Sequence, residues 1–256
     1  MRRARYHYGP RRGQFGELNL PDRVSEPLPG VLLLHGGYWR GIYSYRLMRP
    51  LARALVERGF AVWNVEYRRV GLGGGRGGWP QTFEDVASAA DFLTGIAEVD
   101  ASRLASCGHS AGGHLALWLA GRHRLPEGAP GARPDQLFSA AISLAGVSDL
   151  ERLGDFGLGT ESVDRLLGGT IGEFPERFAA ASPAALLPLG LPQLLAHGLL
   201  DSTVPPAMSE AYARRAGALG DDATYLPLTG LNHRQLIESW HHVVEPVAEY
   251  LDKHFA

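Results

Sequence analysis

The stretch Gly108-His109-Ser110-Ala111-Gly112-Gly113 has the pattern G-x-S-x-G and lies between a predicted strand and a predicted helix. The apolar run 104–107 precedes it, and the run 114–120, which favours a helix, follows it. A serine at a sharp strand-to-helix turn is strained and exposed, as a nucleophile must be. The start of the helix also offers unpaired N–H groups that can stabilise negative charge. The alternative is a glycine-rich turn whose serine only caps the helix, but the flanking elements favour a nucleophile.

The rest of the chain alternates between apolar runs typical of buried strands and segments with helical periodicity. Strands are predicted at 31–34, 60–65, 103–107, 140–144, 194–197 and 224–226, and helices at 47–58, 82–97, 114–120, 206–219 and 234–255. This alternation predicts an α/β fold with a doubly wound, mostly parallel sheet. We expect an edge strand at 14–20, a mobile basic lead-in at 1–13, and a single domain over 1–256. Segment 150–188 interrupts the alternation and predicts a small helical cap inserted above the sheet.

A serine hydroxyl needs an adjacent base, and the best candidate among the ten histidines is His233. It lies in Gly230-Leu231-Asn232-His233, between the last predicted strand and the last predicted helix. The nearest rival is His197, at the end of another predicted strand, whereas His109 is expected to point away from the nucleophile. Since ligands bind at the carboxyl ends of parallel strands, Ser110 and His233 are predicted to meet at one edge of the sheet.

The base needs a carboxylate to hold its tautomer and to stabilise the imidazolium. Asp201 follows a predicted strand, and the order Ser110, Asp201, His233 is that of the α/β-hydrolase triad. The runner-up acid is Asp149, which follows the preceding predicted strand. A turn or helix-cap aspartate is the alternative role for Asp201.

A tetrahedral intermediate also needs preorganised hydrogen-bond donors for its oxyanion. We expect these donors to be the N–H of Ala111 and backbone N–H groups of Gly36 and Gly37, in the strand-end motif that begins with His35. His35 itself is expected to brace the loop rather than carry a proton. A strand-ending turn without catalytic function is the alternative for this motif.

The residues that line a substrate pocket are harder to predict. Tyr38, Trp39 and Trp79 are candidates for an aromatic acyl or aryl pocket, although packing of the two tryptophans beneath the cap is an equal alternative. Cap residues that could close over a substrate are Phe156, Leu158 and Phe174.

Composition excludes several other classes of protein. The chain has 256 residues, 45% of them hydrophobic, and its net charge of 25 − 27 = −2 gives no reason to expect nucleic acid as a partner. No apolar stretch is long enough for a membrane span, and the N-terminal arginines lack the apolar region of a secretory signal. The single Cys107 excludes an internal disulfide and favours a reducing, cytoplasmic location. No Cys/His spacing indicates zinc, so neither metal nor cofactor is expected.

Two motifs together carry a resemblance to a known family. His35-Gly36-Gly37-Tyr38-Trp39 and the G-x-S-x-G stretch resemble the kynurenine formamidase (arylformamidase) and hormone-sensitive-lipase-like esterase branch of the α/β-hydrolase fold superfamily. Esterases of that branch usually carry a third glycine after His-Gly-Gly, whereas Tyr38-Trp39 is the formamidase-like version. Glu66-Tyr67-Arg68 resembles the segment after the next strand of the branch, and the resemblance extends from about residue 14 onward. It implies a serine hydrolase that needs no metal.

We therefore expect a serine hydrolase that cleaves a small carboxylic ester or an aryl formamide such as N-formylkynurenine through an acyl-enzyme. A short-chain carboxylesterase and an arylformamidase remain equal candidates. The alternatives are a non-catalytic small-molecule binding protein, a peptidase or a thioesterase of the same fold. Serine at position 110 argues against dehalogenases and epoxide hydrolases, which use an aspartate there. Small-molecule substrates are the expected partners, and the oligomeric state, including a homodimer, stays open.

Overall fold

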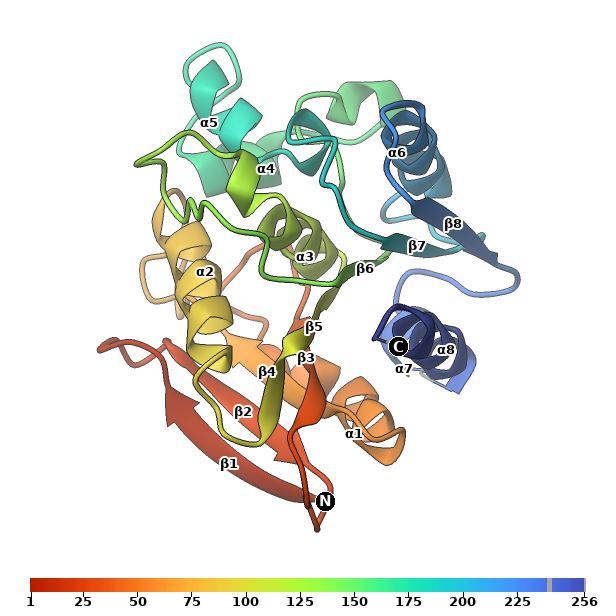
Figure 1. Cartoon of the computed structure of the whole chain (residues 1–256). Helices are drawn as coiled ribbons and strands as arrows, with labels where there is room; N and C mark the ends of the chain where they lie inside the picture. The colour runs from red at the N-terminus through yellow and green to blue at the C-terminus, as the bar shows by residue number, and fades with distance from the viewer. Residues whose placement is uncertain (239–240, 256) are drawn as a thin grey trace.

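One sheet of eight strands runs through the molecule in the order β1-β2-β4-β3-β5-β6-β7-β8 (Figure 1). This computed structural model describes residues 1–238 and 241–255. Strands β3 to β8 are parallel, and β1 and β2 are antiparallel to their neighbours. The strands are β1 (Arg2–His7), β2 (Phe15–Leu20), β3 (Leu28–Leu34), β4 (Ala61–Glu66), β5 (Val99–His109), β6 (Ala140–Leu144), β7 (Gln193–Gly198) and β8 (Ala223–Leu228). The predicted α/β fold with a doubly wound, mostly parallel sheet is confirmed.

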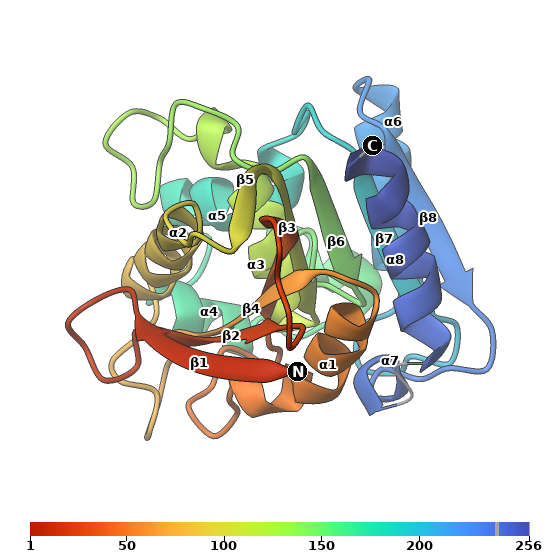
Figure 2. The ribbon, with the colours of Figure 1, turned by 60° about the horizontal axis from the view of Figure 1, so that its bottom comes forward.

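Helices cover both faces of the sheet (Figures 1 and 2). On one face, α1 and α8 contact each other and pack over a cluster of buried residues that includes Val31 and Leu33 of β3. On the other face, α2, α3 and α6 share a second cluster with Leu32 and Leu34. Because both faces are covered, β3 reads as a continuous apolar run. The helices named here are α1 (Arg49–Glu57), α2 (Gln81–Leu93), α3 (Ala111–Ala120), α6 (Pro206–Ala218) and α8 (His241–Phe255), with the short η1 (Tyr45–Met48) before α1 and η2 (Arg122–Arg124) after α3.

The N-terminal region differs from the prediction. Residues 1–13 are not a mobile lead-in, because β1 pairs in register with β2 from Arg2↔Leu20 to His7↔Phe15. The segment 14–20 is consequently not an edge strand, since β2 lies between β1 and β4. Every residue of β1 is exposed, so the strand has no buried face that hydrophobic patterning could reveal. Main-chain pairing with β2 places it, together with side-chain contacts such as Tyr6 with Trp63 and Arg5 with Phe15.

The segment between β6 and β7 contains η3 (Leu153–Phe156), α4 (Glu161–Leu167), α5 (Pro175–Ala181) and η4 (Pro183–Ala185). It lies against the layer of α2 and α3, where Trp118 Nε1 donates a hydrogen bond to the Ala180 carbonyl at 2.9 Å. Its buried residues Leu166 and Phe178 belong to the same cluster as α2 and α3. The helical character predicted for 150–188 is present, and the insertion shares the core of the main fold.

The predicted C-terminal helix 234–255 is present as α7 (Gln235–Glu238) and α8, and residues 239–240 lie outside the described residues. Across the described ranges 1–238 and 241–255, none of the helices combines the length and apolar character that crossing a membrane requires.

Candidate active site

Ser110 lies at a sharp turn between β5 and α3. Its backbone has φ 55° and ψ −121°, a conformation that L-residues rarely adopt. The turn is held from both sides, because the Ser110 N–H donates to the Leu144 carbonyl at 2.9 Å and the His114 N–H donates to the Ser110 carbonyl at 3.0 Å. Such strain is tolerated only where the surrounding structure imposes it. The geometry is that of the predicted strand-to-helix elbow.

The glycines on either side of Ser110 are required by close backbone contacts. A Cβ atom on Gly108 would overlap the carbonyl of Gly112, and a Cβ atom on Gly112 would overlap the carbonyl of Leu34. The chain can therefore place β3, β5 and the start of α3 this close together only with glycine at these two positions.

Asp201 and His233 meet although 32 residues separate them. The Nδ1–H of His233 donates to Oδ2 of Asp201 at 2.6 Å. The other carboxylate oxygen, Oδ1, accepts the N–H groups of Thr203 at 2.8 Å and Val204 at 2.9 Å. With Nδ1 committed to the carboxylate, Nε2 of His233 is the nitrogen left to accept a proton.

A second histidine contacts the same carboxylate. His197, at the end of β7, is fully buried, and its Nε2–H is shared between Oδ2 of Asp201 at 3.2 Å and the Val204 carbonyl at 2.9 Å. Its Nδ1 accepts the hydroxyl of Ser209 at 2.7 Å. The rival base thus reaches the acid, but it has both nitrogens occupied and lies away from the surface.

The environment of Asp201 favours its ionised form. Burial alone would raise the pKa of this carboxyl, but hydrogen bonds from His197, His233 and the backbone hold it well below its usual value. The other candidate acid, Asp149, accepts the Glu151 N–H at 3.2 Å and has an Arg215 nitrogen 3.9 Å from its carboxylate. The geometry therefore favours Asp201 as the partner of His233.

The sequence predicts that His109 points away from the nucleophile. In the structure it lines the same cavity as Ser110. Its ring lies 4.5 Å from that of His233, centroid to centroid, and its Nε2–H donates to the His233 carbonyl at 2.9 Å. The left-handed turn at Ser110 ends the alternation of side-chain directions on which that expectation depended. Burial, together with the nearby His233, lowers the pKa of His109 to about 3, so the ring is neutral at pH 7.

The predicted oxyanion donors surround Ser110. Gly36 packs so closely that a Cβ atom there would lie 2.9 Å from Cβ of Ser110, and Gly37 has φ 111°. Ala111 is the first residue of α3, where N–H groups lack intrahelical partners. The loop that follows β3 and the start of α3 therefore both lie beside Ser110.

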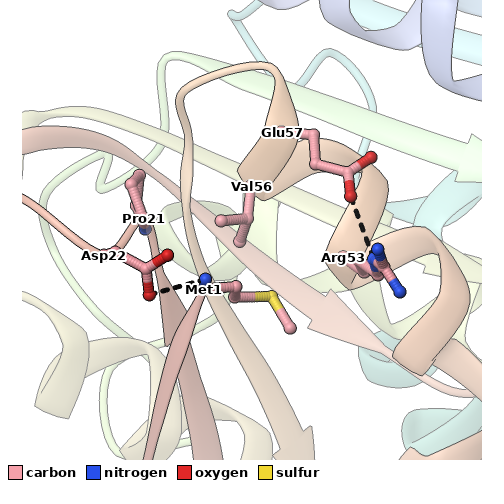
Figure 3. A pocket seen from close by; sticks show the side chains of 6 residues that line it. All are labelled: Met1, Pro21, Asp22, Arg53, Val56 and Glu57. Carbon is pink, nitrogen blue, oxygen red and sulfur yellow. Dashed lines mark hydrogen bonds and ion pairs between the residues drawn. The ribbon is translucent and has the colours of Figure 1, made fainter.

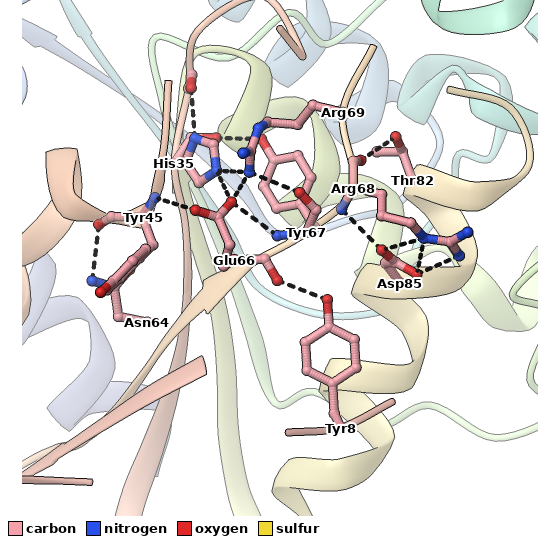
Figure 4. A network of polar contacts seen from close by, with 11 residues as sticks. Tyr8, His35, Tyr45, Asn64, Glu66, Tyr67, Arg68, Arg69, Thr82 and Asp85 are labelled. Atoms are coloured by element: carbon pink, nitrogen blue, oxygen red, sulfur yellow. Dashed lines mark hydrogen bonds and ion pairs between the residues drawn. The ribbon is translucent and has the colours of Figure 1, made fainter. Parts of the chain in front are cut away.

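His35 braces this loop from beneath (Figure 4). Its Nδ1–H donates to the Gly36 carbonyl at 2.7 Å, and its carbonyl accepts the Tyr67 hydroxyl at 2.7 Å. Its Nε2 lies 3.2 Å from Oε1 of Glu66 and 3.4 Å from Nη1 of Arg69, which is ion-paired with Glu66. Burial, reinforced by the positive charge of Arg69, lowers the pKa of His35 to about 3. A neutral, buried ring agrees with the bracing role expected for this residue.

A cavity of about 300 Å³, here called the serine cavity, opens over these residues. It is lined by Gly36, Gly37, Tyr38, Tyr43, Leu47, His109, Ser110, Thr203, His233, Arg234 and Ile237. The nucleophile and base candidates therefore face one space. Sequence reasoning missed Tyr43, Leu47 and Ile237, which reach the cavity from a loop, η1 and α7 and carry no motif.

Three expected pocket residues have different outcomes. Tyr38 lines the serine cavity and is 43% exposed, whereas Trp39 and Trp79 do not line it. Trp39 is buried edge-on against His114 with centroids 5.2 Å apart, and Trp79 packs on Phe83 at 5.1 Å. The two tryptophans fit the alternative in which they pack the loops. The position of Trp39 follows from the backbone, since φ is 54° at both residues 38 and 39 and turns the second side chain inward.

The insertion does not border the serine cavity. Phe156 and Leu158 pack against the cluster shared by α2 and α3, and Phe174 lies under the guanidinium of Arg177 at 3.7 Å. The cap residues expected to close over a substrate thus have other neighbours in this structure.

Cavity size alone does not identify the site. A larger hollow of about 560 Å³ lies near the N-terminus (Figure 3). Its charged groups are paired with one another, as Met1 N with Asp22 at 2.7 Å and Arg53 with Glu57 at 2.9 Å. Its lining contains no serine, cysteine or histidine, and its two carboxylates are held in ion pairs, so the chemistry points to the smaller serine cavity.

Among residues 1–238 and 241–255, no group of three or more His, Cys, Asp or Glu side chains could hold a metal ion. Cys107 is fully buried in β5, and burial raises the pKa of its thiol to about 12, which makes it an inert core residue.

Comparisons with known proteins identify the relatives of this chain. Residues 17–215 match the model of the BD-FAE family. The chain is 35% identical over 112 residues to kynurenine formamidase of Danio rerio and 34% identical to that of Salmo salar. Each alignment covers 44% of this chain, and the chain spans 36% of the length of these relatives.

Solved structures show the same fold at low identity. A truncated carbohydrate esterase from gut microbiota has a TM-score of 0.83 with 18% identity, over 98% of this chain and 96% of that one. The butyrate-bound esterase Est2 of Thermogutta terrifontis has a TM-score of 0.74 with 21% identity, over 98% and 94% of the two chains. The expected resemblance to esterases and kynurenine formamidases is confirmed at the level of family and fold. The chain belongs to the BD-FAE family and has the α/β-hydrolase fold.

Proposed function

We propose that this protein is a serine hydrolase in which Ser110 is the nucleophile, His233 the base and Asp201 the acid. The observation that carries the proposal is the 2.6 Å hydrogen bond between His233 and Asp201, made by a histidine that lines the same cavity as Ser110. The strained backbone of Ser110 at the start of α3 supports the same assignment.

The chemistry follows from these positions. Oγ of Ser110 attacks the substrate carbonyl carbon while Nε2 of His233 takes the hydroxyl proton, and Asp201 stabilises the imidazolium. The N–H groups of Ala111, Gly36 and Gly37 are the proposed donors to the oxyanion; loss of one such donor typically costs about 3 kcal/mol of transition-state stabilisation. His233 then returns the proton to the leaving alcohol or amine, and water hydrolyses the acyl-enzyme by the reverse sequence.

We propose a small carboxylic ester or an aryl formamide as substrate. The serine cavity holds about 300 Å³, the low end of the range for small-molecule sites, and Tyr38, Tyr43, Leu47 and Ile237 give it apolar walls. The relatives named kynurenine formamidase and the structures named esterase support the two substrate classes. The walls fit an aryl ring or a short acyl chain.

Two experiments test the proposal. A fluorophosphonate should label Ser110, and Ser110→Ala should lose about 10⁶-fold in kcat, as in other serine hydrolases. Labelling at another residue, or retention of most activity by Ser110→Ala, would contradict the assignment. A panel of p-nitrophenyl esters of rising chain length beside N-formylkynurenine would then separate the substrate classes, because a formamidase should strongly prefer the formamide.

A further inference from the structure

Three consecutive residues of the loop after β3 have backbone angles that favour glycine. The angle φ is 111° at Gly37 and 54° at both Tyr38 and Trp39. The Arg40 N–H donates to the Gly37 carbonyl at 2.9 Å, so residues 37–40 form a turn whose two central residues have positive φ. Turns of this kind prefer Asn-Gly, Asp-Gly or Gly-Gly at the centre, because other side chains are strained there. The loop therefore carries two aromatic side chains where the backbone disfavours them.

The burial of Trp39 and its main-chain contacts impose this turn. Trp39 is 2% exposed and packs edge-on against His114. Its carbonyl accepts the Val70 N–H at 2.9 Å, and the Val70 carbonyl accepts the Gly41 N–H at 2.9 Å, which ties the turn to the loop after β4. Strained residues persist only where the surrounding structure determines their conformation. Trp39 thus has a structural reason to be aromatic.

Tyr38 has no comparable role inside the protein. It is 43% exposed, and within residues 1–238 and 241–255 its side chain makes no hydrogen bond, ion pair or ring contact. Glycine would fit the backbone better at this position. Tyr38 nevertheless lines the serine cavity together with Ser110 and His233. Because backbone strain clusters at ligand-binding and active sites, these observations favour a ligand as the partner of the ring.

The surroundings of Tyr38 fit a planar apolar group. The surface of the serine cavity is mainly carbon, with Tyr43, Leu47 and Ile237 among its lining residues. The Tyr43 ring is fixed against the loop, since a Cβ atom on Gly37 would overlap it. Aromatic rings attract one another in offset-stacked or edge-to-face arrangements, beyond the gain from burial of apolar area. An aromatic group beside Tyr38 would therefore be stabilised more than an alkyl chain of similar size.

We propose that Tyr38 is a specificity-determining residue of the serine cavity, and that the strained turn 37–40 holds its ring where the ring packs against an aromatic group of the substrate. This assignment rests on the proposed serine hydrolase function. Tyr38 exchanges no proton and forms no bond in the reaction. Its contribution is binding energy, which raises kcat/KM for substrates that carry an aromatic group.

Two pairs of esters test the assignment on the full chain, with hydrolysis followed by pH-stat titration. Phenyl acetate against ethyl acetate varies the leaving group, and methyl benzoate against methyl butyrate varies the acyl group. Comparing each variant with the unaltered chain removes differences in intrinsic reactivity. Tyr38→Ala should lower kcat/KM about tenfold for the aryl member of at least one pair and less than about threefold for its alkyl partner. Tyr38→Phe keeps the ring and should behave as the unaltered chain does.

A comparison of Tyr38→Gly with Tyr38→Ala separates substrate contact from loop position. Both substitutions remove the ring, but only glycine fits a φ of 54°, so the glycine variant should melt about 2–4 °C above the alanine variant. Both should lose the same preference for the aryl ester, because the ring itself contacts the substrate. Ile42→Ala is the matched control, since this exposed apolar residue of the same loop does not line the serine cavity, and it should leave the preference unchanged.

The possible failures are distinguishable. Unchanged kcat/KM in Tyr38→Ala, equal losses for aryl and alkyl esters, recovery of the preference in Tyr38→Gly, or a glycine variant no more stable than the alanine variant would overturn the assignment alone. If the unaltered chain hydrolyses none of the four esters and a fluorophosphonate does not label Ser110, the proposed function fails, and the assignment fails with it. If Tyr38→Ala does not fold, the glycine variant against Tyr38→Phe decides.

Discussion

At two places in the sheet, a histidine contacts a carboxylate at the carboxyl ends of two neighbouring parallel strands. His35 follows β3 and contacts Glu66 at the end of β4. His233 follows β8 and contacts Asp201, which follows β7. The first pair is buried, and Arg69 already neutralises its carboxylate. The second pair has no arginine among its described contacts, and its histidine lines the serine cavity. We therefore propose that a histidine–carboxylate pair serves as a brace at the first position and as a base at the second. Two features separate the roles. One is whether the second ring nitrogen of the histidine reaches a cavity, and the other is whether the carboxylate is still free to stabilise an imidazolium.

The largest expected effect is on kcat, and it comes from changing the carboxylate of the second pair. Asp201→Asn should lower kcat by about 10⁴-fold, because the amide cannot hold the required tautomer of His233 or stabilise its protonated form. Asp149→Asn is the control, since this residue is also buried but its carboxylate contacts Arg215 and the Glu151 N–H instead of His233, and the kcat of the variant should stay nearly unchanged. Steady-state kinetics on the two variants would decide, and a larger loss in Asp149→Asn would exchange the roles of the two acids.

The first pair should respond in stability. Glu66→Gln leaves Arg69 as a buried charge without its counter-ion, which should cost about 3–5 kcal/mol in the free energy of unfolding. Glu57→Gln is the matched control, because Glu57 pairs with Arg53 on the exposed face of α1 and such pairs contribute below about 1 kcal/mol. Urea unfolding measures both. Equal stability of the two variants would mean that the His35 network does not brace the loop.

The pH dependence of the free energy of unfolding should report on two buried histidines, His35 in the first pair and His109 beside the second. The pKa values of His35 and His109 are lowered to about 3, mainly by burial. The unfolded chain binds these protons near pH 6.5 while the folded chain does not, so stability is full above that pH and falls as the pH is lowered toward 3. Each ring contributes a slope of about 1.4 kcal/mol per pH unit in this window.

Urea unfolding between pH 7 and 4 checks this expectation. His35→Gln and His109→Gln should each reduce the slope by about that one contribution, because the replaced side chain no longer titrates. Above pH 7 the variants and the unaltered chain should share one slope. A slope unchanged by both substitutions would show that the two rings are protonated in the folded protein.

The sequence could predict the fold because the evidence for it is local. The runs Val31–Leu34 and Phe60–Val65 are apolar since both faces of the sheet are covered, and the elbow glycines are fixed by contacts with neighbouring backbone. Strand β1 escaped prediction because its residues are all exposed, although the strand pairs in register with β2. Patterning reports burial, so an element without a buried face gives no signal.

The candidate site was predictable for residues that belong to motifs and not for those that arrive by tertiary packing. Ser110, Asp201 and His233 follow strands in a known order, whereas Tyr43 and Ile237 reach the serine cavity from a loop and a short helix without any pattern. Trp39 fails as a pocket residue because the backbone turn at residues 38 and 39 directs it into the core. The direction predicted for His109 was wrong because the relative direction of side chains at the elbow depends on the unusual φ value of Ser110.

Substitution of His109 has the smallest expected effect. It tests whether the His233–Asp201 pair depends on a neighbouring hydrogen bond, as the His35–Glu66 pair depends on Arg69. Its Nε2–H donates to the His233 carbonyl, so it holds the loop of the proposed base without touching a proton that moves in the reaction. His109→Ala should lower kcat/KM about tenfold, the value of one lost hydrogen bond of about 1.4 kcal/mol. His109→Gln, which can still donate, should recover part of the loss, and the pH–rate profile should shift if His233 becomes less well oriented. Full activity in His109→Ala, or no recovery in the glutamine variant, would mean that Asp201 alone positions His233.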